Sequence, residues 1–541
     1  MCFSWWTSRL PVSLQNYQLL QRNPQPIMSS PPFNVISSTA SELQDRLKAG
    51  TITSVEVITA YLAQIEKHNH AGAKLNAVIG VAPREVVLKA ARKLDRERTA
   101  GKTRGPFHGL PIIVKDCFHF RPELGFKTTV GAFCFMEEKA KKNAKVIEQL
   151  IEKGVIILGT ANLSEFCGHV AENMTPGWSA VGGQTRSAYE KGPPPDVSEP
   201  KSGLAAPCGG SSSGSAVAVS AGFVPFSLGT ETGGSLVYPA SKAGLYAMRP
   251  AHGSVSADGV FRISRSFDAI GVIARTPYDL SLLTESILTP ATRARLPKNG
   301  YKDSLTGSWE GLRVGILPST WGGAGPDHKL KWGTSPVKKV YDGVAEKINE
   351  KGGFAVYPIE IPEAVHTNST LKHNGLSMKD IAYREFNDVV QEFCDGFESP
   401  KIRTLADIIE YNKEHAEIAM PPPHTDQKEL IESYNSLLSA EEAADAYREI
   451  NRKAGKDGMD RYMRGNDVDI IVSSSDSTLV TWASDAAYPS ATVPLGNLEN
   501  GYPYGLFILA RAGSEDLLFR FMRAFEATFP KIKGPCQLGI T

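Results

Sequence analysis

The chain has 541 residues, of which 41% are hydrophobic and 22% are charged, so it can bury a large globular core. Its 59 Lys and Arg residues nearly balance 58 Asp and Glu residues, for a formal net charge of +1. This balance argues against nucleic acid or an anionic membrane surface as a partner, because both are bound through a strong positive field. A small-molecule substrate fits the composition better.

The first 35 residues differ from the rest of the chain. They contain Arg9, Arg22 and five prolines but no acidic residue. Organelle-targeting peptides are also basic and poor in acids, but this segment lacks the Arg-rich amphipathic helix that such peptides use. We therefore expect residues 1–35 to be a disordered N-terminal extension, with a start codon at Met28 as an alternative.

Helix-start signals and apolar runs alternate from about residue 39 onward. Thr39 and Thr53 each precede a glutamate by three positions, the spacing that caps the start of a helix. Further helices are expected at 83–98 and 144–152, and buried strands at 75–81, 110–114 and 155–158, the last closed by Gly159. Helices that alternate with short, fully apolar strands predict an α/β layer fold.

The second half of the chain changes character twice. Residues 186–207 contain Gly192-Pro-Pro-Pro195 and no periodicity, which predicts a surface loop. Residues 360–465 carry charged helical patterns, which predict a helical layer or cap with helices at 404–415 and 440–453. Strands are expected to return at 468–472, 491–495 and 504–510.

Cysteine usage bears on the compartment. An odd number of cysteines with no C-x-x-C pair argues against a disulfide framework or a zinc site, and for a reducing, cytoplasmic location. The seven are Cys2, Cys117, Cys134, Cys167, Cys208, Cys394 and Cys536. The longest apolar stretch, residues 216–228, is interrupted by a glycine and a proline, so we predict no transmembrane segment.

The most informative region is the run Pro207-Cys-Gly-Gly-Ser-Ser-Ser-Gly-Ser215. An isolated Gly/Ser run is typical of a flexible linker, but this one leads directly into the apolar segment 216–224. A glycine-rich turn before a buried helix presents N–H groups and hydroxyls at the helix N-terminus, where negative charge is stabilised. This turn is therefore a candidate site.

Three chemistries could use such a turn. A phosphate-binding loop needs a lysine after the glycines, and neither this run nor the later Gly233-Gly-Ser235 supplies one. Gly210-Ser-Ser-Ser-Gly214 formally matches the nucleophile elbow of α/β hydrolases, with Ser212 at its centre. However, the preceding residues 203–208 make a poor strand, and later histidines such as His366, His373, His415 and His424 have no recognisable catalytic setting.

The third chemistry follows from a family resemblance. The first run and Gly229-Thr-Glu-Thr-Gly-Gly-Ser235 resemble the amidase signature family, and Ser211 and Ser235 are 24 positions apart, as in that family. Gly109-Leu-Pro-Ile-Ile-Val-Lys-Asp116 is similar to its lysine motif. Further segments occur in the family order, covering about residues 39–530 in all: 159–166, 178–184, 248–250, 268–271, 274–276 and 502–506.

The resemblance implies both a fold and a site. The fold would be one large α/β/α domain over residues 36–541, with helices on both faces of a mixed central sheet. Ser235 would be the nucleophile, Ser211 a bridging serine held by a cis peptide, and Lys115 the base. The oxyanion hole would consist of backbone N–H groups around Thr232, Gly233, Gly234 and Ser235. No cofactor or metal is implied.

Each of these roles has a physical reason. A serine hydroxyl is a poor nucleophile until a neighbour takes its proton, and a lysine can do so only when neutral. Burial at the end of the 110–114 strand would disfavour the ammonium form of Lys115. Ser211 would relay the proton, an acyl-enzyme would form on Ser235, and the glycines before it would let the backbone approach the substrate closely.

Other residues of these motifs are expected to be structural. Asn162, Glu165, Asp268 and Arg275 are interpreted as scaffold contacts, and Cys117 and Cys208 as packed thiols. Many relatives carry arginine where this chain has Val237, which disfavours a substrate anchored there by a carboxylate. The segments that most resemble stand-alone amidases of filamentous fungi are residues 187–189 with the loop after them, 222–225 and 404–412.

Two functional classes remain open from the sequence. The first is a free amidase that hydrolyses the carboxamide of a small organic amide, alone or as a homodimer. The second is the A-type subunit of a glutamine-dependent tRNA amidotransferase, which uses the same three residues and passes ammonia to a partner. Activity of the purified chain on simple amides would separate the two classes.

Overall fold

The computed structural model describes residues 31–172, 174–190, 207–323, 330–361, 371–535 and 538. Its contacts divide the chain into Met1–Asn34 and Val35–Thr541, and the helices and strands below belong to the second unit. The predicted extension over residues 1–35 lies almost entirely outside the described residues. Most of the predicted surface loop at 186–207 lies outside them as well.

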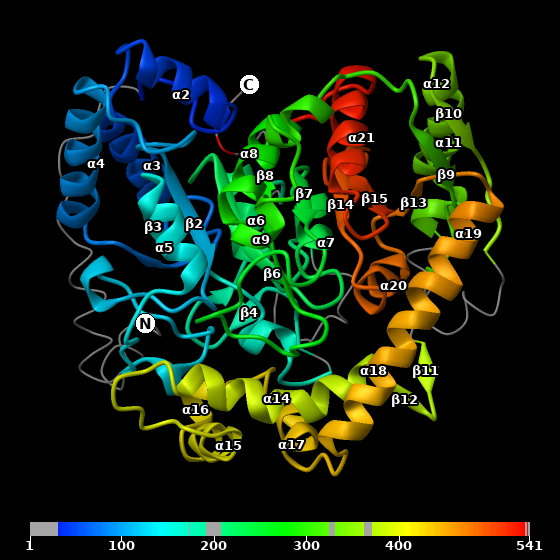
Figure 1. The fold of residues 1–541 in the computed structure, drawn as a ribbon. Coiled ribbons are helices and arrows are strands. Elements are labelled where there is room, and N and C mark those ends of the chain that lie inside the picture. The colour runs from blue at the N-terminus through cyan, green and yellow to red at the C-terminus, as the bar shows by residue number, and fades with distance from the viewer. Residues whose placement is uncertain are drawn as a thin grey trace. The chain divides into compact units, whose positions relative to one another are not determined.

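A mixed sheet of eleven strands runs through the second unit, as Figure 1 shows. Three strands pair in parallel near one edge (β3, β2, β6) and three near the other (β13, β9, β10), with antiparallel pairs between them. In sheet order the strands are β1 Val78–Val81, β3 Ile156–Ala161, β2 Pro111–Lys115, β6 Phe226–Glu231, β8 Ala269–Ala274, β7 Tyr246–Arg249, β14 Ser490–Asn497, β15 Pro503–Ala510, β13 Ile470–Ser474, β9 Arg313–Ile316 and β10 Phe354–Val356.

The central strands are buried along their whole length. Every residue of β2, β3, β6 and β8 is buried, which requires helices on both faces of the sheet. One set, α6 (Ser213–Ser220) and α7 (Val237–Lys242), packs on the sheet and on each other. A second set, α5 (Lys145–Glu152), α8 (Pro277–Ile287) and α21 (Glu515–Thr528), does the same. The predicted α/β fold with a covered mixed sheet is confirmed.

The predicted helix starts are confirmed at the N-terminal end of this unit. Thr39 and Thr53 form capping boxes with Glu42 and Glu56, at the starts of α2 (Ala40–Lys48) and α3 (Ser54–His68). The remaining helices outside the layer described below are α4 Arg84–Thr99, α9 Pro290–Arg293, α11 Pro336–Asp342, α12 Val344–Glu350, α19 Asp460–Gly465 and α20 Leu479–Asp485.

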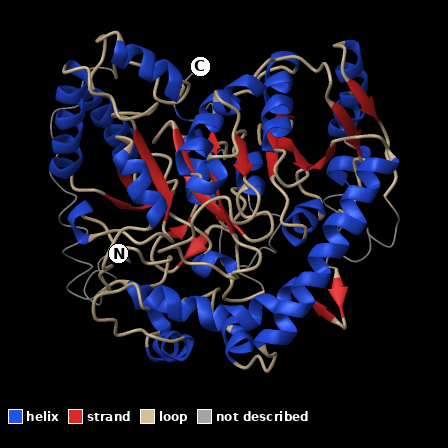
Figure 2. Cartoon of the chain, in the orientation of Figure 1, coloured by secondary structure: helices blue, strands red, loops and turns tan. Residues whose placement is uncertain are grey.

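A layer of helices lies along one end of the sheet, at the bottom of Figures 1 and 2. It comprises α14 Met378–Cys394, α15 Leu405–Glu414, α16 Ala416–Ala419, α17 Lys428–Tyr434 and α18 Ala440–Ala454, next to the short hairpin of β11 (Lys372–His373) and β12 (Leu376–Ser377). Ile381 of α14 and Ile450 of α18 belong to one buried apolar cluster with Phe267, which precedes β8. This cluster joins the layer to the sheet.

Two predicted strand boundaries were wrong. β1 begins at Val78 rather than 75, because Lys74 and Asn76 adopt φ values of 50° and 47° and turn the chain before the strand. β3 continues through Gly159 to Ala161 instead of ending at 158. Glycine fits inside this strand because a Cβ at Gly159 would lie 2.3 Å from the carbonyl oxygen of Gly80.

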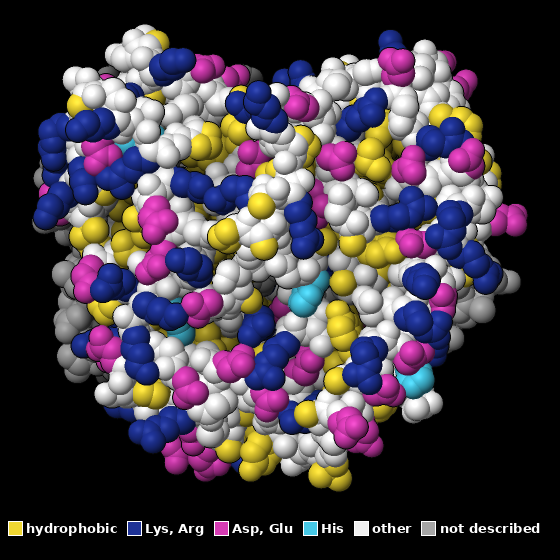
Figure 3. Space-filling view, viewed as in Figure 1, with side chains coloured by type: hydrophobic (Ala, Val, Ile, Leu, Met, Phe, Trp, Pro, Cys, Tyr) yellow, Lys and Arg dark blue, Asp and Glu magenta, His cyan; other side chains and the backbone are white. Residues whose placement is uncertain are grey.

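The surface has no single dominant charge on the face seen in Figure 3, where basic and acidic side chains alternate. Within the described part of the chain, every helix is too short or too polar to cross a bilayer.

Candidate active site

Lys115 is the last residue of β2, between the parallel strands β3 and β6. Its side chain is fully buried. The Nζ atom donates hydrogen bonds of 2.8 Å to Ser211 Oγ and 2.8 Å to Thr230 Oγ1, and it forms no ion pair within the described residues. Because its partners are hydroxyls rather than carboxylates, this amine can receive a proton as well as donate one.

Ser211 lies in the turn that leads into α6, and the peptide bond between Gly210 and Ser211 is cis. Its side chain is nearly buried, and its carbonyl oxygen accepts a hydrogen bond from Ser164 N–H. The helix that follows fits tightly against β3, since a Cβ at Gly214 would lie 2.4 Å from the carbonyl oxygen of Asn162. Packing of α6 therefore fixes the turn that carries Ser211.

Ser235 lies in the turn between β6 and α7 and is half-buried. The residue before it, Gly234, has φ of 94°, a conformation that suits glycine. The carbonyl oxygen of Ser235 accepts a 2.9 Å hydrogen bond from Ser212 N–H. This bond ties the two serine-bearing turns together.

A buried acid holds the far side of the Ser235 turn. Glu231 Oε2 accepts hydrogen bonds from the N–H groups of Leu236 (2.9 Å) and Val237 (3.0 Å). Its other oxygen lies 3.6 Å from Arg249 Nε, and both side chains are completely buried. These two oxygens fix where the backbone of the turn runs.

Ser211 and Ser235 line one cleft of about 320 Å³, together with Gly233 and Gly234. Within the described residues, nothing accepts a hydrogen bond from the N–H groups of Gly233, Gly234 or Ser235. Three backbone donors beside a serine hydroxyl are the arrangement that stabilises an oxyanion. Thr232 is not among the lining residues, and its side chain instead hydrogen-bonds to Asp268.

The alternative nucleophile, Ser212, is directed away from this cleft. Its Oγ donates a 3.0 Å hydrogen bond to the carbonyl oxygen of Thr230 and accepts one from Thr230 N–H. The side chain is fully buried, and no histidine lines the cleft within the described residues. The geometry of a nucleophile elbow is therefore absent from this part of the chain.

The acidic residues of the motifs are buried and hydrogen-bonded to backbone. Burial raises the pKa of Asp116 to about 7 despite hydrogen bonds from Thr129 and Gly131. Burial likewise raises the pKa of Asp268, which accepts from Ile263 N–H. Glu165 accepts a 2.6 Å hydrogen bond from Ala180 N–H, and burial raises its pKa to about 8. All three would carry a proton more readily than an ordinary carboxyl group.

Two further expectations about the motifs are confirmed. Asn162 donates to the carbonyl oxygens of Asn76 and Gly183, and Arg275 donates to that of Ile36, so both act as scaffold residues. Cys117 and Cys208 are buried free thiols.

Sequence reasoning missed several residues of the site. Thr230 and Glu231 belong to the second glycine run, which should have drawn attention to them. Cys167, whose Sγ lies 3.9 Å from Thr230 Oγ1, also lines the cleft. So does Asp476, where burial opposes ionisation but the neighbouring Lys331 and Lys242 hold the pKa of the carboxyl well below its usual range. No motif marked Cys167 or Asp476.

Comparison with protein families gives a match over most of the chain, because a model named Amidase covers residues 56–519. A protein of Schizosaccharomyces pombe that bears the name amidase is 28% identical over 90% of this chain and 85% of its own length. One of Arabidopsis thaliana with the same name is 30% identical over 92% of this chain and 91% of its own. The A-type subunit of a glutamyl-tRNA(Gln) amidotransferase from Chloroflexus aggregans is 36% identical, but over 51% of this chain and 53% of its own.

Solved structures give the same result. The peptide amidase of Stenotrophomonas maltophilia superimposes with a TM-score of 0.80 at 29% identity, covering 92% of this chain and 98% of that one. An amidase family protein of Bacillus anthracis has a TM-score of 0.80 at 25% identity, covering 93% of this chain and 92% of that one.

Proposed function

The chain belongs to the amidase family of hydrolases that act on amide C–N bonds, and from this premise we propose that it is a free-standing amidase with Ser235 as its nucleophile. Ser211 and Lys115 complete the proposed triad. The observation that carries the proposal is the 2.8 Å contact between Lys115 Nζ and Ser211 Oγ, in a cleft that Ser211 and Ser235 line together.

In the first step, neutral Lys115 accepts the proton of Ser211 as Ser211 accepts the proton of Ser235. The Ser235 oxygen then bonds to the carbonyl carbon of the amide, and the carbonyl π electrons move to its oxygen. The N–H groups of Gly233, Gly234 and Ser235 are the proposed donors to that oxyanion. They need no reorganisation as charge develops, which is the main advantage of such a site.

In the second step, the C–N bond breaks and the leaving nitrogen takes a proton from Lys115 through Ser211. An ester between Ser235 and the acyl group remains. A water molecule attacks this ester, its proton passing along the same path, and the carboxylic acid leaves with Ser235 restored. Two hydroxyls and one amine suffice for both half-reactions.

A free amidase fits the comparisons better than a component of an amidotransferase. The higher identity to the Chloroflexus protein is confined to half of this chain, whereas the proteins named amidase align over about nine-tenths of it. We therefore propose a small amide as the substrate, with no obligatory partner chain. The buried free thiols of Cys134, Cys167 and Cys394 support a reducing compartment such as the cytoplasm.

The experiment is to purify the chain alone and measure release of acid and ammonia or amine from a panel of aliphatic and aryl amides. We expect turnover without any partner or added cofactor. Activity that requires a second protein, or that is confined to glutamine, would instead assign the chain to an amidotransferase.

A further inference from the structure

A second cavity, of about 200 Å³, adjoins the cleft. Ala171 and Met174 line both cavities, and Glu165 in the second cavity directly follows Ser164 in the cleft. The opposite wall comes from α16 and the loop after it, through Met420 and His424. The cavity is called the Trp178 pocket below, after the largest side chain that lines it.

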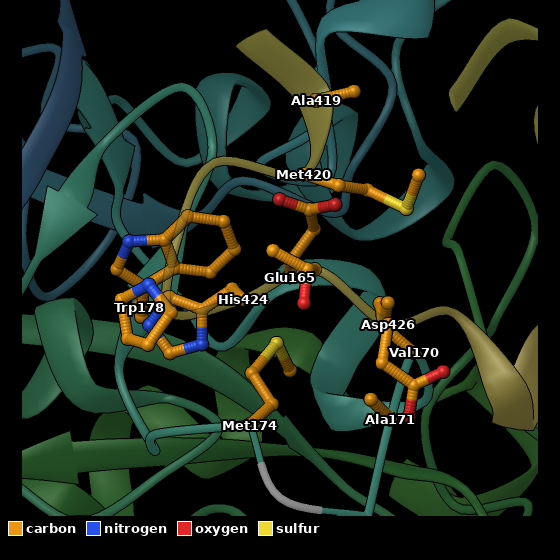
Figure 4. Close-up of a pocket in the computed structure, with 11 residues that line it drawn as sticks. Glu165, Val170, Ala171, Met174, Trp178, Ala419, Met420, His424 and Asp426 are labelled. Carbon is orange, nitrogen blue, oxygen red and sulfur yellow. The ribbon is translucent and has the colours of Figure 1, made fainter. Parts of the chain in front are cut away.

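Flat and apolar side chains dominate the Trp178 pocket. The rings of Trp178 and His424 lie face to face on one side, with centroids 4.0 Å apart and an angle of 30°, as Figure 4 shows. Val170 and Ala171 lie on the other side in Figure 4. Aromatic rings favour offset stacking and edge contacts with other rings, so these walls suit a planar guest.

The interior of the pocket is uncharged near neutral pH. Burial lowers the pKa of His424 to about 4, which leaves its ring neutral, and burial raises the pKa of Glu165 to about 8, which keeps its carboxyl protonated. Asp426 also lines the pocket but is solvent-exposed. A charged guest would lose its hydration without gaining a buried counter-charge, so the pocket disfavours one.

The volume matches one ring. A cavity of about 150 Å³ lined by apolar side chains is known to hold benzene, so about 200 Å³ accommodates a phenyl group with part of its linker. A small aliphatic amide bound at Ser235 would leave this volume unused.

We infer that the Trp178 pocket receives an uncharged aromatic ring carried by the amide substrate, so that arylalkyl amides are the preferred substrate class. This inference rests on the proposed function and adds a specificity site to it. The residues that determine the preference are those that shape the pocket, above all Trp178, His424 and Met420.

The test compares propanamide with the series from phenylacetamide to 5-phenylpentanamide, which varies the distance from ring to carboxamide. Wild type should show an optimum within the series, with kcat/KM about 10- to 100-fold above propanamide, the gain expected for burying an aromatic ring. Ala419→Phe, which fills the pocket, should reduce that ratio to near one. Met420→Ala, at a half-buried position, should shift the preference toward the bulkier naphthyl homologue.

The matched control is Met136→Ala, because Met136 is also half-buried but lines neither cavity. It should keep the wild-type ratio. If Ala419→Phe and Met420→Ala also keep that ratio while wild type hydrolyses both kinds of amide, the inference is wrong and the proposed function stands.

Calorimetry separates the two proposals if wild type hydrolyses no amide. Intact 3-phenylpropanamide is then titrated into the Ser235→Ala protein, with and without Ala419→Phe. Binding weakened at least tenfold by Ala419→Phe supports the pocket assignment even though the proposed function has failed. Absence of binding, or equal binding by both proteins, overturns the assignment.

Discussion

Lys115 Nζ lies 2.8 Å from Ser211 Oγ, although 96 positions separate the two residues in the chain. The contact exists because β2 and β6 pair in parallel and α6 packs across both strands, which brings the turn before α6 to the end of β2. The proposed proton path depends on this one contact, so the first predictions concern the groups that make it.

Ser211→Ala should lower kcat by about 100- to 10,000-fold, the range for loss of a proton-transferring group, because Ser235 then has no relay to Lys115. Steady-state kinetics on an aryl amide measure the effect. The matched control is Ser213→Ala, since Ser213 is equally buried and its Oγ has no partner within the described residues. A Ser211→Ala enzyme within tenfold of the control would argue against the relay.

Thr230→Val should lower kcat by about 10- to 100-fold with little change in KM, because it removes the second hydroxyl that orients Lys115 Nζ. Thr230→Ser keeps that hydroxyl and should restore most of the rate. The comparison separates positioning of the amine from packing of the side chain. Equal losses in the two variants, or an effect on KM alone, would contradict this role.

Glu231→Gln should reduce the free energy of unfolding by about 3–5 kcal/mol, because it leaves the charge of Arg249 buried without an opposite charge. Urea unfolding followed by fluorescence measures the change. Glu449→Gln is the control, since Glu449 pairs with Arg452 at the surface and its loss should leave the midpoint almost unmoved. Equal midpoints for the two variants would show that the buried pair contributes nothing.

Asp485→Asn should change how stability depends on pH. Burial raises the pKa of Asp485 to about 8, and neither of its oxygens has a partner within the described residues. Below about pH 4 the carboxyl is protonated whether the chain is folded or unfolded, so it costs nothing there. Between about pH 4 and 8 only the folded protein retains the proton, and wild type loses stability relative to Asp485→Asn by about 1.4 kcal/mol per pH unit.

Above pH 8 this difference should level off, because the group is then ionised in both states. Urea unfolding of both proteins at pH 4, 6 and 8 gives the slope. Other buried acids, such as Glu165, contribute equally to both proteins and cancel in the difference. A difference that is constant across this range would contradict the raised pKa of Asp485.

Local signals in the sequence predicted some elements well and others poorly. The capping boxes at Thr39 and Thr53 lie within four residues of chain, so their sequence spacing determines them. Strands β9 and β10 were not predicted, because three or four residues at a sheet edge leave no clear pattern and depend on pairing with β13. Long-range contacts decide such elements.

The site divides in the same way. Lys115, Ser211 and Ser235 lie in runs whose spacing matches a family, so they could be named from the sequence. Asp476 and the Trp178 pocket could not, since they are assembled from segments hundreds of positions apart that share no motif. Folding alone brings Trp178 against His424.

The most direct measurement is to react the protein with a fluorophosphonate and locate the added mass by peptide mass spectrometry. The proposed mechanism predicts one adduct, on Ser235, with labelling lost in Ser235→Ala and strongly slowed in Lys115→Met. An adduct on Ser212, or undiminished labelling of the Ser235→Ala protein, would contradict it.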